Sequence, residues 1–132
     1  MNAIRIDHVG IVVDDLAQAA AFVTGILGFA FDREAKGATQ VKAAWYSCGT
    51  VSVELIEFLD PVQRADRLGS ALARIEHIAI EVDDVEVAAA DLRAKGGRFN
   101  AAQPVIFNGV RSYFSVPEST AGVEWQLMDR RG

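Results

Sequence analysis

The sequence has few of the residues on which several classes of protein depend. Its 132 residues include one cysteine, three prolines and two histidines, with 13 Lys and Arg against 18 Asp and Glu. A single cysteine, Cys48, excludes an intramolecular disulfide and fits a reducing compartment, as a small strand residue rather than a reactive thiol. The net charge of −5 leaves too little positive charge to attract a nucleic-acid backbone. We therefore expect no nucleic-acid partner.

Long hydrophobic runs are also missing. Residues 19–23 form one of the longest, and Thr24 and Gly25 end it far short of the roughly 20 residues of a membrane-spanning helix. The first residues carry Arg5 and Asp7 among isoleucines and lack the apolar core of a signal peptide. With 51% apolar and 23% charged residues, the chain can still bury a core. We expect one cytoplasmic domain, residues 1–132, without a membrane partner.

What the sequence does contain is an internal repeat. Residues 6–15, IDHVGIVVDD, match residues 75–84, IEHIAIEVDD, 69 positions later. The same offset carries Trp45 onto Phe114. The repeat predicts two similar modules, at about residues 1–60 and 74–132, with a connector at about 61–73.

Each module begins with a β-branched run, continues with an Asp-Asp pair and a helix-forming stretch, and then returns to short runs typical of strands. Aspartate is a good N-cap, and glycine commonly ends a helix. The pattern predicts an α+β fold built from two βαβββ modules. Beyond the first strands, the expected helices span residues 15–28 and 84–97, with strands at 29–33, 42–47 and 51–58, then at 98–100, 110–116 and 123–128, and a helical turn at 70–73.

Strand alternation places the histidines of the two modules on equivalent faces. In each first strand, aliphatic residues alternate with His8 or His77, and the aliphatic side must cover the helix. Both histidines therefore turn to the other face. The same alternation in the last strand of each module puts Glu54 and Gln126 on that face, with Glu124 two residues before Gln126.

These polar residues predict a divalent metal site. A lone histidine is more often a hydrogen-bonded, half-buried residue, but here both histidines of the chain occupy the same position of the repeat. Two imidazoles, a carboxylate and an amide oxygen suit zinc, nickel, cobalt, manganese or ferrous iron, with positions open for water or substrate. We expect one such ion per chain, bound by His8, Glu54, His77 and Gln126.

The same segments carry a resemblance to a known family. The halves resemble the paired modules of the vicinal oxygen chelate superfamily, which includes glyoxalase I, methylmalonyl-CoA epimerase, extradiol dioxygenases and the fosfomycin and bleomycin resistance proteins. Within the superfamily, these segments most resemble the sequences of glyoxalase I and methylmalonyl-CoA epimerase. The resemblance implies an incomplete barrel of two modules around a metal bound by the four residues just named. It rests on residues 6–15, 53–56, 75–79 and 122–127.

The resemblance implies a metal-dependent isomerase or lyase, in which the ion chelates adjacent substrate oxygens and stabilises an enediolate while Glu54 moves a proton. Two positions depart from these enzymes. They typically place a proton-handling glutamate where this chain has Gln126, and an amide cannot act as a base. The epimerase also has a glutamate on a middle strand, whereas this chain has no carboxylate between Glu34 and Glu54. Glu124 is an alternative ligand or acid.

Two other classes of function stay open. One is a ferrous dioxygenase, because His8, His77 and Glu54 make a 2-His-1-carboxylate set. The other is a protein that binds a small molecule, such as a drug, without chemistry. Resistance proteins of this kind tend to lack the ligand set, so its presence favours an enzyme with a small-molecule substrate.

Four further residues are candidates for substrate binding. Lys42 and Arg111 occupy matching positions and could hold an anionic group, although charges that discourage strand pairing at an edge explain them as well. Trp45 and Tyr113 could line a pocket or belong to the core. Because an incomplete barrel leaves sheet edges uncovered, we also expect a homodimer.

Overall fold

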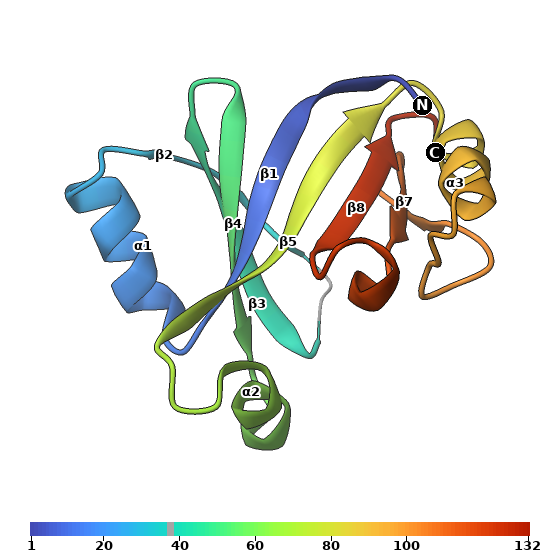
Figure 1. The fold of residues 1–132 in the computed structure, drawn as a ribbon. Coiled ribbons are helices and arrows are strands. Elements are labelled where there is room, and N and C mark those ends of the chain that lie inside the picture. Colours follow the sequence, from blue (N-terminus) through green and yellow to red (C-terminus); the bar gives the residue numbers. More distant parts are fainter. Residues whose placement is uncertain (37–38) are drawn as a thin grey trace. The chain divides into compact units, whose positions relative to one another are not determined.

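The computed structural model describes residues 1–36 and 39–132 (Figure 1). Its elements repeat the predicted order of strand, helix and three strands. None of the helices in the described ranges has the length and apolar character that crossing a membrane requires. In chain order the elements are β1 (Ala3–Val13), α1 (Leu16–Gly25), β2 (Ala30–Glu34), β3 (Val41–Cys48), β4 (Val51–Phe58), α2 (Pro61–Leu68), β5 (Ala73–Val82), α3 (Val85–Ala94), β6 (Val105–Phe107), β7 (Val110–Phe114), a 3-10 turn (Pro117–Ser119) and β8 (Glu124–Asp129).

The chain forms two compact units. The first unit is His8–Glu76, and the second unit combines Met1–Asp7 with His77–Gly132. The boundaries between the units fall before His8, within β1, and before His77, within β5. Both strands therefore contribute to both units. In the first unit the strand order is β2-β3-β4-β1, and in the second it is β5-β8-β7-β6. Within each unit one pair, β1 with β4 or β5 with β8, is parallel, and the other pairs are antiparallel.

The two main helices begin as the sequence predicts. The side chain of Asp15 accepts a hydrogen bond from the backbone N of Gln18, 3.0 Å away, at the start of α1. At the start of α3, the side chain of Asp84 accepts one from the backbone N of Glu86 at 2.9 Å. Each cap satisfies a backbone donor that has no partner inside its helix.

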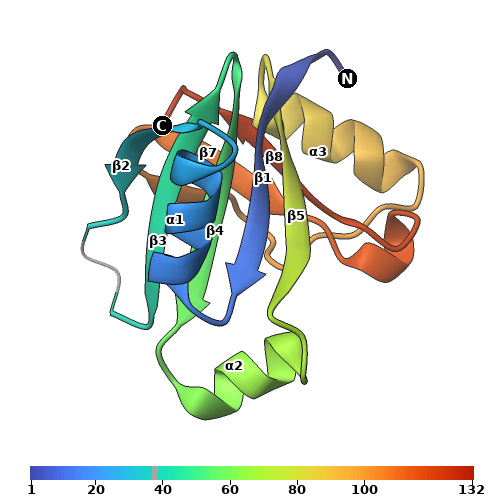
Figure 2. The same ribbon diagram turned by 90° about the vertical axis from the view of Figure 1, so that its left-hand side faces the viewer.

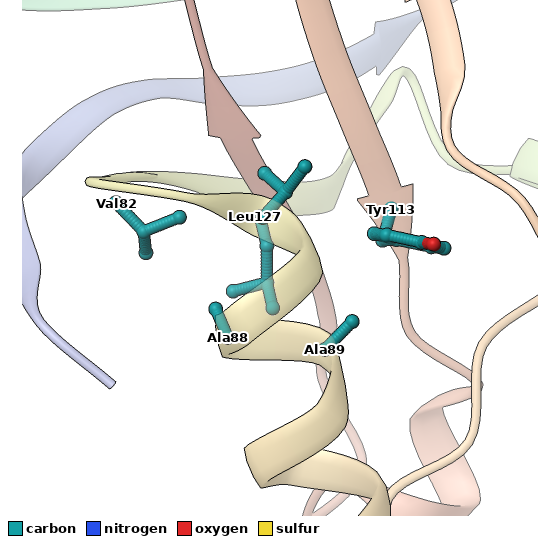
Figure 3. Packing of buried hydrophobic residues seen from close by; sticks show 6 residues of the cluster. Val82, Ala88, Ala89, Tyr113 and Leu127 are labelled. Atoms are coloured by element: carbon teal, nitrogen blue, oxygen red, sulfur yellow. The ribbon is translucent and has the colours of Figure 1, made fainter. Parts of the chain in front are cut away.

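Each helix covers the aliphatic face of its own strands, as strand alternation predicts. In the first unit α1 lies over β3 and β4 (Figure 2). Figure 3 shows the corresponding cluster beside α3. The faces that carry the histidines are therefore left free of these two helices. Buried members of the first cluster are Val13, Val23, Ala44, Tyr46 and Leu55, and those of the second are Val82, Val85, Ala88, Ala89, Tyr113 and Leu127.

Two elements differ from the prediction. The connector contains a helix at Pro61–Leu68 instead of a turn at 70–73, because the Asp60 side chain caps it by accepting from the backbone N of Gln63 and proline occupies its first turn. Residues 98–100 form only an isolated bridge, and the additional strand of this module is β6. Asn108 and Gly109, both with positive φ, make the two-residue turn from β6 to β7. This Asn-Gly pair is a hairpin signal in the sequence.

Candidate metal centre

One half of the candidate site lies in the first unit, on β1 and β4. These parallel strands pair with His8 beside Ser52 and Gly10 beside Glu54. Nε2 of His8 lies 3.4 Å from Oε1 of Glu54. His8 is buried, and the Glu54 side chain is 13% exposed. Gly10, the residue paired with Glu54, has no side chain.

The matching half lies in the second unit, on β5 and β8. These strands are also parallel and pair His77 with Glu124 and Ala79 with Gln126. Both His77 and Gln126 are buried, at 4% and 8% exposure. Nε2 of Gln126 donates a hydrogen bond to Oγ of Ser112, 2.9 Å away on β7. The amide is therefore held through its nitrogen.

An aromatic ring meets each histidine edge-on. The ring centres of His8 and Trp45 are 6.4 Å apart with an interplanar angle of 87°. Those of His77 and Phe114 are 5.9 Å apart at 88°. The aromatic pair that the repeat relates at the sequence level thus has the same contact in both units, and it restricts the orientation of each imidazole.

The strand register shows which residues correspond in the two units. Glu54 and Gln126 each lie opposite the small residue two positions after the histidine. Glu124 lies opposite the histidine itself, which is the position of Ser52. Opposite the small residue, the first unit therefore has a carboxylate, Glu54, and the second has an amide, Gln126. The alignment of the two modules predicts this correspondence.

The chemistry of these side chains fits a divalent ion. His8, Glu54 and His77 are residues that could hold a metal. Two imidazole nitrogens and a carboxylate oxygen are ligands that zinc and other divalent transition ions accept. Since the nitrogen of Gln126 is bound to Ser112, its carbonyl oxygen is the atom left to act as a ligand.

Glu124 belongs to another set of possible ligands. It is grouped with Glu76 and His77 as residues that could hold a metal. Glu76, however, forms an ion pair with Arg67 of the helix α2. A bound ion there would have to compete with that guanidinium, so this set is the weaker candidate.

Of the four predicted substrate-binding residues, Trp45 alone lies on the same face as the histidine of its unit. Lys42 lies on the α1 side of β3, with Nζ 3.8 Å from Oε2 of Glu57. Tyr113 is buried in the core beside α3, where its hydroxyl donates to Glu86 at 3.1 Å. Burial, followed by this hydrogen bond, raises the pKa of Tyr113. Lys42 and Tyr113 therefore contact carboxylates on the helix side of their strands.

Arg111 also lies on the helix side, in a network at the start of α3. Its guanidinium donates to both carboxylate oxygens of Asp129, at 3.0 and 2.5 Å, and to Asp84 at 3.1 Å. Asp129 is 1% exposed and accepts from the backbone N of Val85 at 2.8 Å. Although burial acts to raise the pKa of Asp129, the hydrogen bonds from Arg111 and the backbone outweigh it and lower that pKa to about 2. Nothing in this geometry directs Arg111 toward a substrate.

Two residues next to the candidate site were not predicted. Ser112, which holds Gln126, could have been found by alternation, because it shares a face of β7 with Phe114. Arg33 lies over the ring of Trp45, with its guanidinium carbon 4.3 Å from the ring centre. No local pattern predicts this contact, because it depends on a shift in the register of β2 and β3 between Phe31 and Arg33.

Comparisons with known proteins bear on this site. Residues 7–114 match the family model described as the glyoxalase/bleomycin resistance protein/dioxygenase superfamily. The chain belongs to this superfamily. It is 34% identical to the mitochondrial methylmalonyl-CoA epimerase of Homo sapiens, over 96% of this chain and 74% of that protein. It is 30% identical to an uncharacterized Bacillus subtilis protein, YqjC, over 97% and 94% of the two chains.

Solved structures agree with this membership. A hypothetical protein from Bacillus halodurans matches with a TM-score of 0.85 and 25% identity, over 97% of this chain and 95% of that one. A variant of Streptomyces coelicolor methylmalonyl-CoA epimerase, in complex with 2-nitronate-propionyl-CoA, matches with a TM-score of 0.84 and 27% identity, over 96% and 97%. Another epimerase structure contains methylmalonyl-CoA. The predicted superfamily and fold class are confirmed.

Proposed function

We propose that this superfamily member is a metal-dependent isomerase or lyase that moves a proton next to a carbonyl group of a small substrate. The observation that carries the proposal is the pairing of buried His8 with Glu54, together with buried His77 and Gln126 at the equivalent positions of the strand register. We propose that these four residues hold one ion. When bound, the ion would supply a Lewis acid that stabilises negative charge developing on a substrate oxygen.

Glu54 is the proposed proton carrier. Its carboxylate accepts the proton that leaves the substrate carbon and returns it to a neighbouring atom. The other three proposed ligands are neutral, and the amide of Gln126 cannot take a proton. Trp45 lies directly opposite Glu54 on β3, and we propose that its ring keeps water from the carboxylate on that side. Protein groups that exclude water strengthen the electrostatic interactions of a reacting charge.

A single base favours proton transfer on one face of the substrate. An epimerase that removes a proton from one face and adds it on the other needs a second acid at the opposite side. The site face of β3 offers Val41, Ala43, Trp45 and Ser47 and no carboxylate. The similarity to methylmalonyl-CoA epimerase therefore supports a substrate with an acidic C–H beside a carbonyl or thioester, but not the two-base reaction.

A ferrous dioxygenase is the second candidate. It is favoured by His8, His77 and Glu54, because two imidazoles and one carboxylate form the 2-His-1-carboxylate set of ferrous oxygenases. Oxygen consumption separates the two functions. The isomerase or lyase consumes no oxygen, whereas a dioxygenase does so with each turnover.

We further propose that the protein acts in the cytoplasm as a homodimer, with its module boundaries at about residues 60 and 74. The single cysteine supports the compartment. The position of β2 and β6 at sheet edges supports the dimer, because a second copy can cover an open edge. A monomeric mass by light scattering at micromolar concentration would overturn the dimer.

The proposed function is tested on protein purified without chelators. Elemental analysis should find about one divalent ion per chain, and His77→Ala should lose most of it because one of four ligands is removed. Solvent deuterium should enter methylmalonyl-CoA or a hemithioacetal at the carbon next to the carbonyl, followed by NMR. Metal binding without exchange, together with oxygen uptake, would favour the dioxygenase. Neither exchange nor uptake would favour a binding protein.

A further inference from the structure

An irregularity in β2 decides which side chain faces Trp45. Strands β2 and β3 are antiparallel, with Phe31 opposite Tyr46, and their register shifts between Phe31 and Arg33. After the shift Arg33, rather than Asp32, lies opposite Trp45. Such β-bulges redirect a side chain and are common next to active sites. In this strand the bulge replaces a carboxylate by a guanidinium at the edge of the candidate site.

A continuous series of contacts in the first unit leads from Arg33 to the proposed base. The guanidinium carbon lies 4.3 Å from the centre of the Trp45 ring, a cation–π contact. Trp45 in turn lies opposite Glu54 in the ladder of β3 and β4 and contacts His8 edge-on. A substrate group bound at Arg33 and Trp45 would therefore lie next to the side chains to which we assign the chemistry.

The indole N–H of Trp45 lacks an acceptor. Among the described residues, Nε1 of Trp45 is the buried side-chain nitrogen or oxygen without a hydrogen-bond partner. A buried donor without a partner costs free energy, and buried tryptophan N–H groups usually find one. An oxygen atom of a ligand would satisfy this donor.

Among the described residues, the ion-pair partner of the Arg33 guanidinium is exposed. Nη1 of Arg33 lies 2.6 Å from Oδ2 of Asp32, and the two side chains are 57% and 46% exposed. Exposed ion pairs contribute little free energy, so Asp32 is readily exchanged for another anion. A guanidinium presents two parallel N–H groups that match the two oxygens of a carboxylate.

We propose that Arg33 and Trp45 form the part of the site that binds a carboxylate group of the substrate. The inference rests on the proposed function, because it places this carboxylate beside Glu54 and the proposed metal ligands. The guanidinium binds the two oxygens, and the indole N–H donates to one of them once the side chains adjust to the ligand. The substrate class is thereby narrowed to small acids that also carry a carbonyl group.

The experiment uses Trp45 as its own reporter. The chain has two tryptophans, so Trp125→Phe leaves Trp45 as the single source of tryptophan fluorescence. This full-length variant is titrated with malonate, with neutral malonamide and with inorganic phosphate, as purified and after chelator treatment. We expect the fluorescence of Trp45 to change saturably with malonate and to stay constant with malonamide.

Substitutions at the bulge then locate the binding. Arg33→Gln should weaken malonate binding about tenfold or more, and Arg33→Lys should be intermediate because it keeps the charge without the planar pair of donors. Asp32→Asn should strengthen binding, because it removes the competing carboxylate. Arg74→Gln, at an exposed arginine of β5, makes the same change of net charge and should have no effect.

Four results would overturn the inference: no saturable binding, equal binding of malonamide, tighter binding of phosphate than of malonate, or equal affinities in the parent and Arg33→Gln. Thermal unfolding of each variant checks that it is folded. The proposed function fails separately. If the parent protein contains no metal and catalyses no exchange but binds malonate through Arg33, the proposed function alone is refuted. If it contains the metal but its binding of malonate does not depend on Arg33, the carboxylate site alone is refuted.

Discussion

In both modules a carboxylate accepts a hydrogen bond from the backbone at the start of the main helix, but the cations near this carboxylate are more distant in the first module. The backbone N of Leu16 donates to Glu57 at 2.8 Å. The cations near this carboxylate, Lys42 and Arg64, remain 3.8 and 4.0 Å away. A hollow of about 530 Å³ lies beside them, bounded on one side by Asp15.

In the second module the equivalent network is closed. The backbone N of Val85 donates to Asp129, and Arg111 bridges Asp129 and Asp84 with hydrogen bonds of 2.5 to 3.1 Å. The nearby hollow is smaller, about 160 Å³. A lysine at the matching position reaches its carboxylate with a single point charge, whereas the arginine forms several directed hydrogen bonds.

The same difference extends to the candidate site. In the first unit the residue opposite the small strand position is Glu54, which can carry a proton. In the second unit it is Gln126, which Ser112 holds in place. We infer that the first module carries the reacting group and that the second holds an amide in place at the equivalent position. This division of roles predicts different effects of equivalent substitutions in the two modules.

Glu54→Gln should produce the largest effect. Removal of the proposed base should lower the rate of deuterium exchange by a factor of about 10² to 10⁴, the usual contribution of a general acid or base. Glu118→Gln, at an exposed glutamate, is the matched control and should leave the rate unchanged. Retention of more than a tenth of the activity by Glu54→Gln would place the base elsewhere.

Asp129→Asn compares the two networks by stability. It should lower the free energy of unfolding by about 3 kcal/mol, because a buried partner of Arg111 is lost. Glu57→Gln, the equivalent change in the first module, should cost about 1 kcal/mol or less, since the cations there are distant. Urea unfolding followed by circular dichroism measures both. Equal losses would show that the networks do not differ in strength.

Acid should weaken the second network. The pKa of Asp129 is lowered from 3.8 to about 2 in the folded protein. A lowered pKa stabilises the fold above the unfolded value and loses that contribution as the pH falls from about 4 to about 2. The loss should be about 2 kcal/mol in the parent protein and absent in Asp129→Asn. Parallel stability curves for the two proteins between pH 5 and pH 2 would contradict this.

Gln126→Glu should have the smallest effect of the four. A second carboxylate should tighten zinc binding by about tenfold, measured against a competing chelator, because it adds negative charge around the ion. If the second module only lacks a base, the variant should also gain exchange activity on a thioester or hemithioacetal. Tighter binding without any gain would favour a dioxygenase or a binding protein. Weaker binding would remove Gln126 from the ligand set.

The amino-acid sequence by itself determined the repeat, the order of its main elements and the faces of its strands. These features follow from local patterns: β-branched runs, capping aspartates and the two-residue period that sets His8 and His77 apart from their aliphatic neighbours. The correspondence of Glu54 with Gln126 also followed, because both precede a similar aliphatic stretch. What is determined locally is visible in a single segment.

Only the tertiary structure decided what each side chain meets on a neighbouring strand. The sequence treats Lys42 and Arg111 as equivalent, yet one has a distant partner and the other a closed network. The bulge in β2 brought Arg33 instead of Asp32 to Trp45, and a shift by one residue exchanges the two faces of a strand. Such pairings depend on residues far apart in the chain, so the chemistry at the edge of the site is set by register rather than by local pattern.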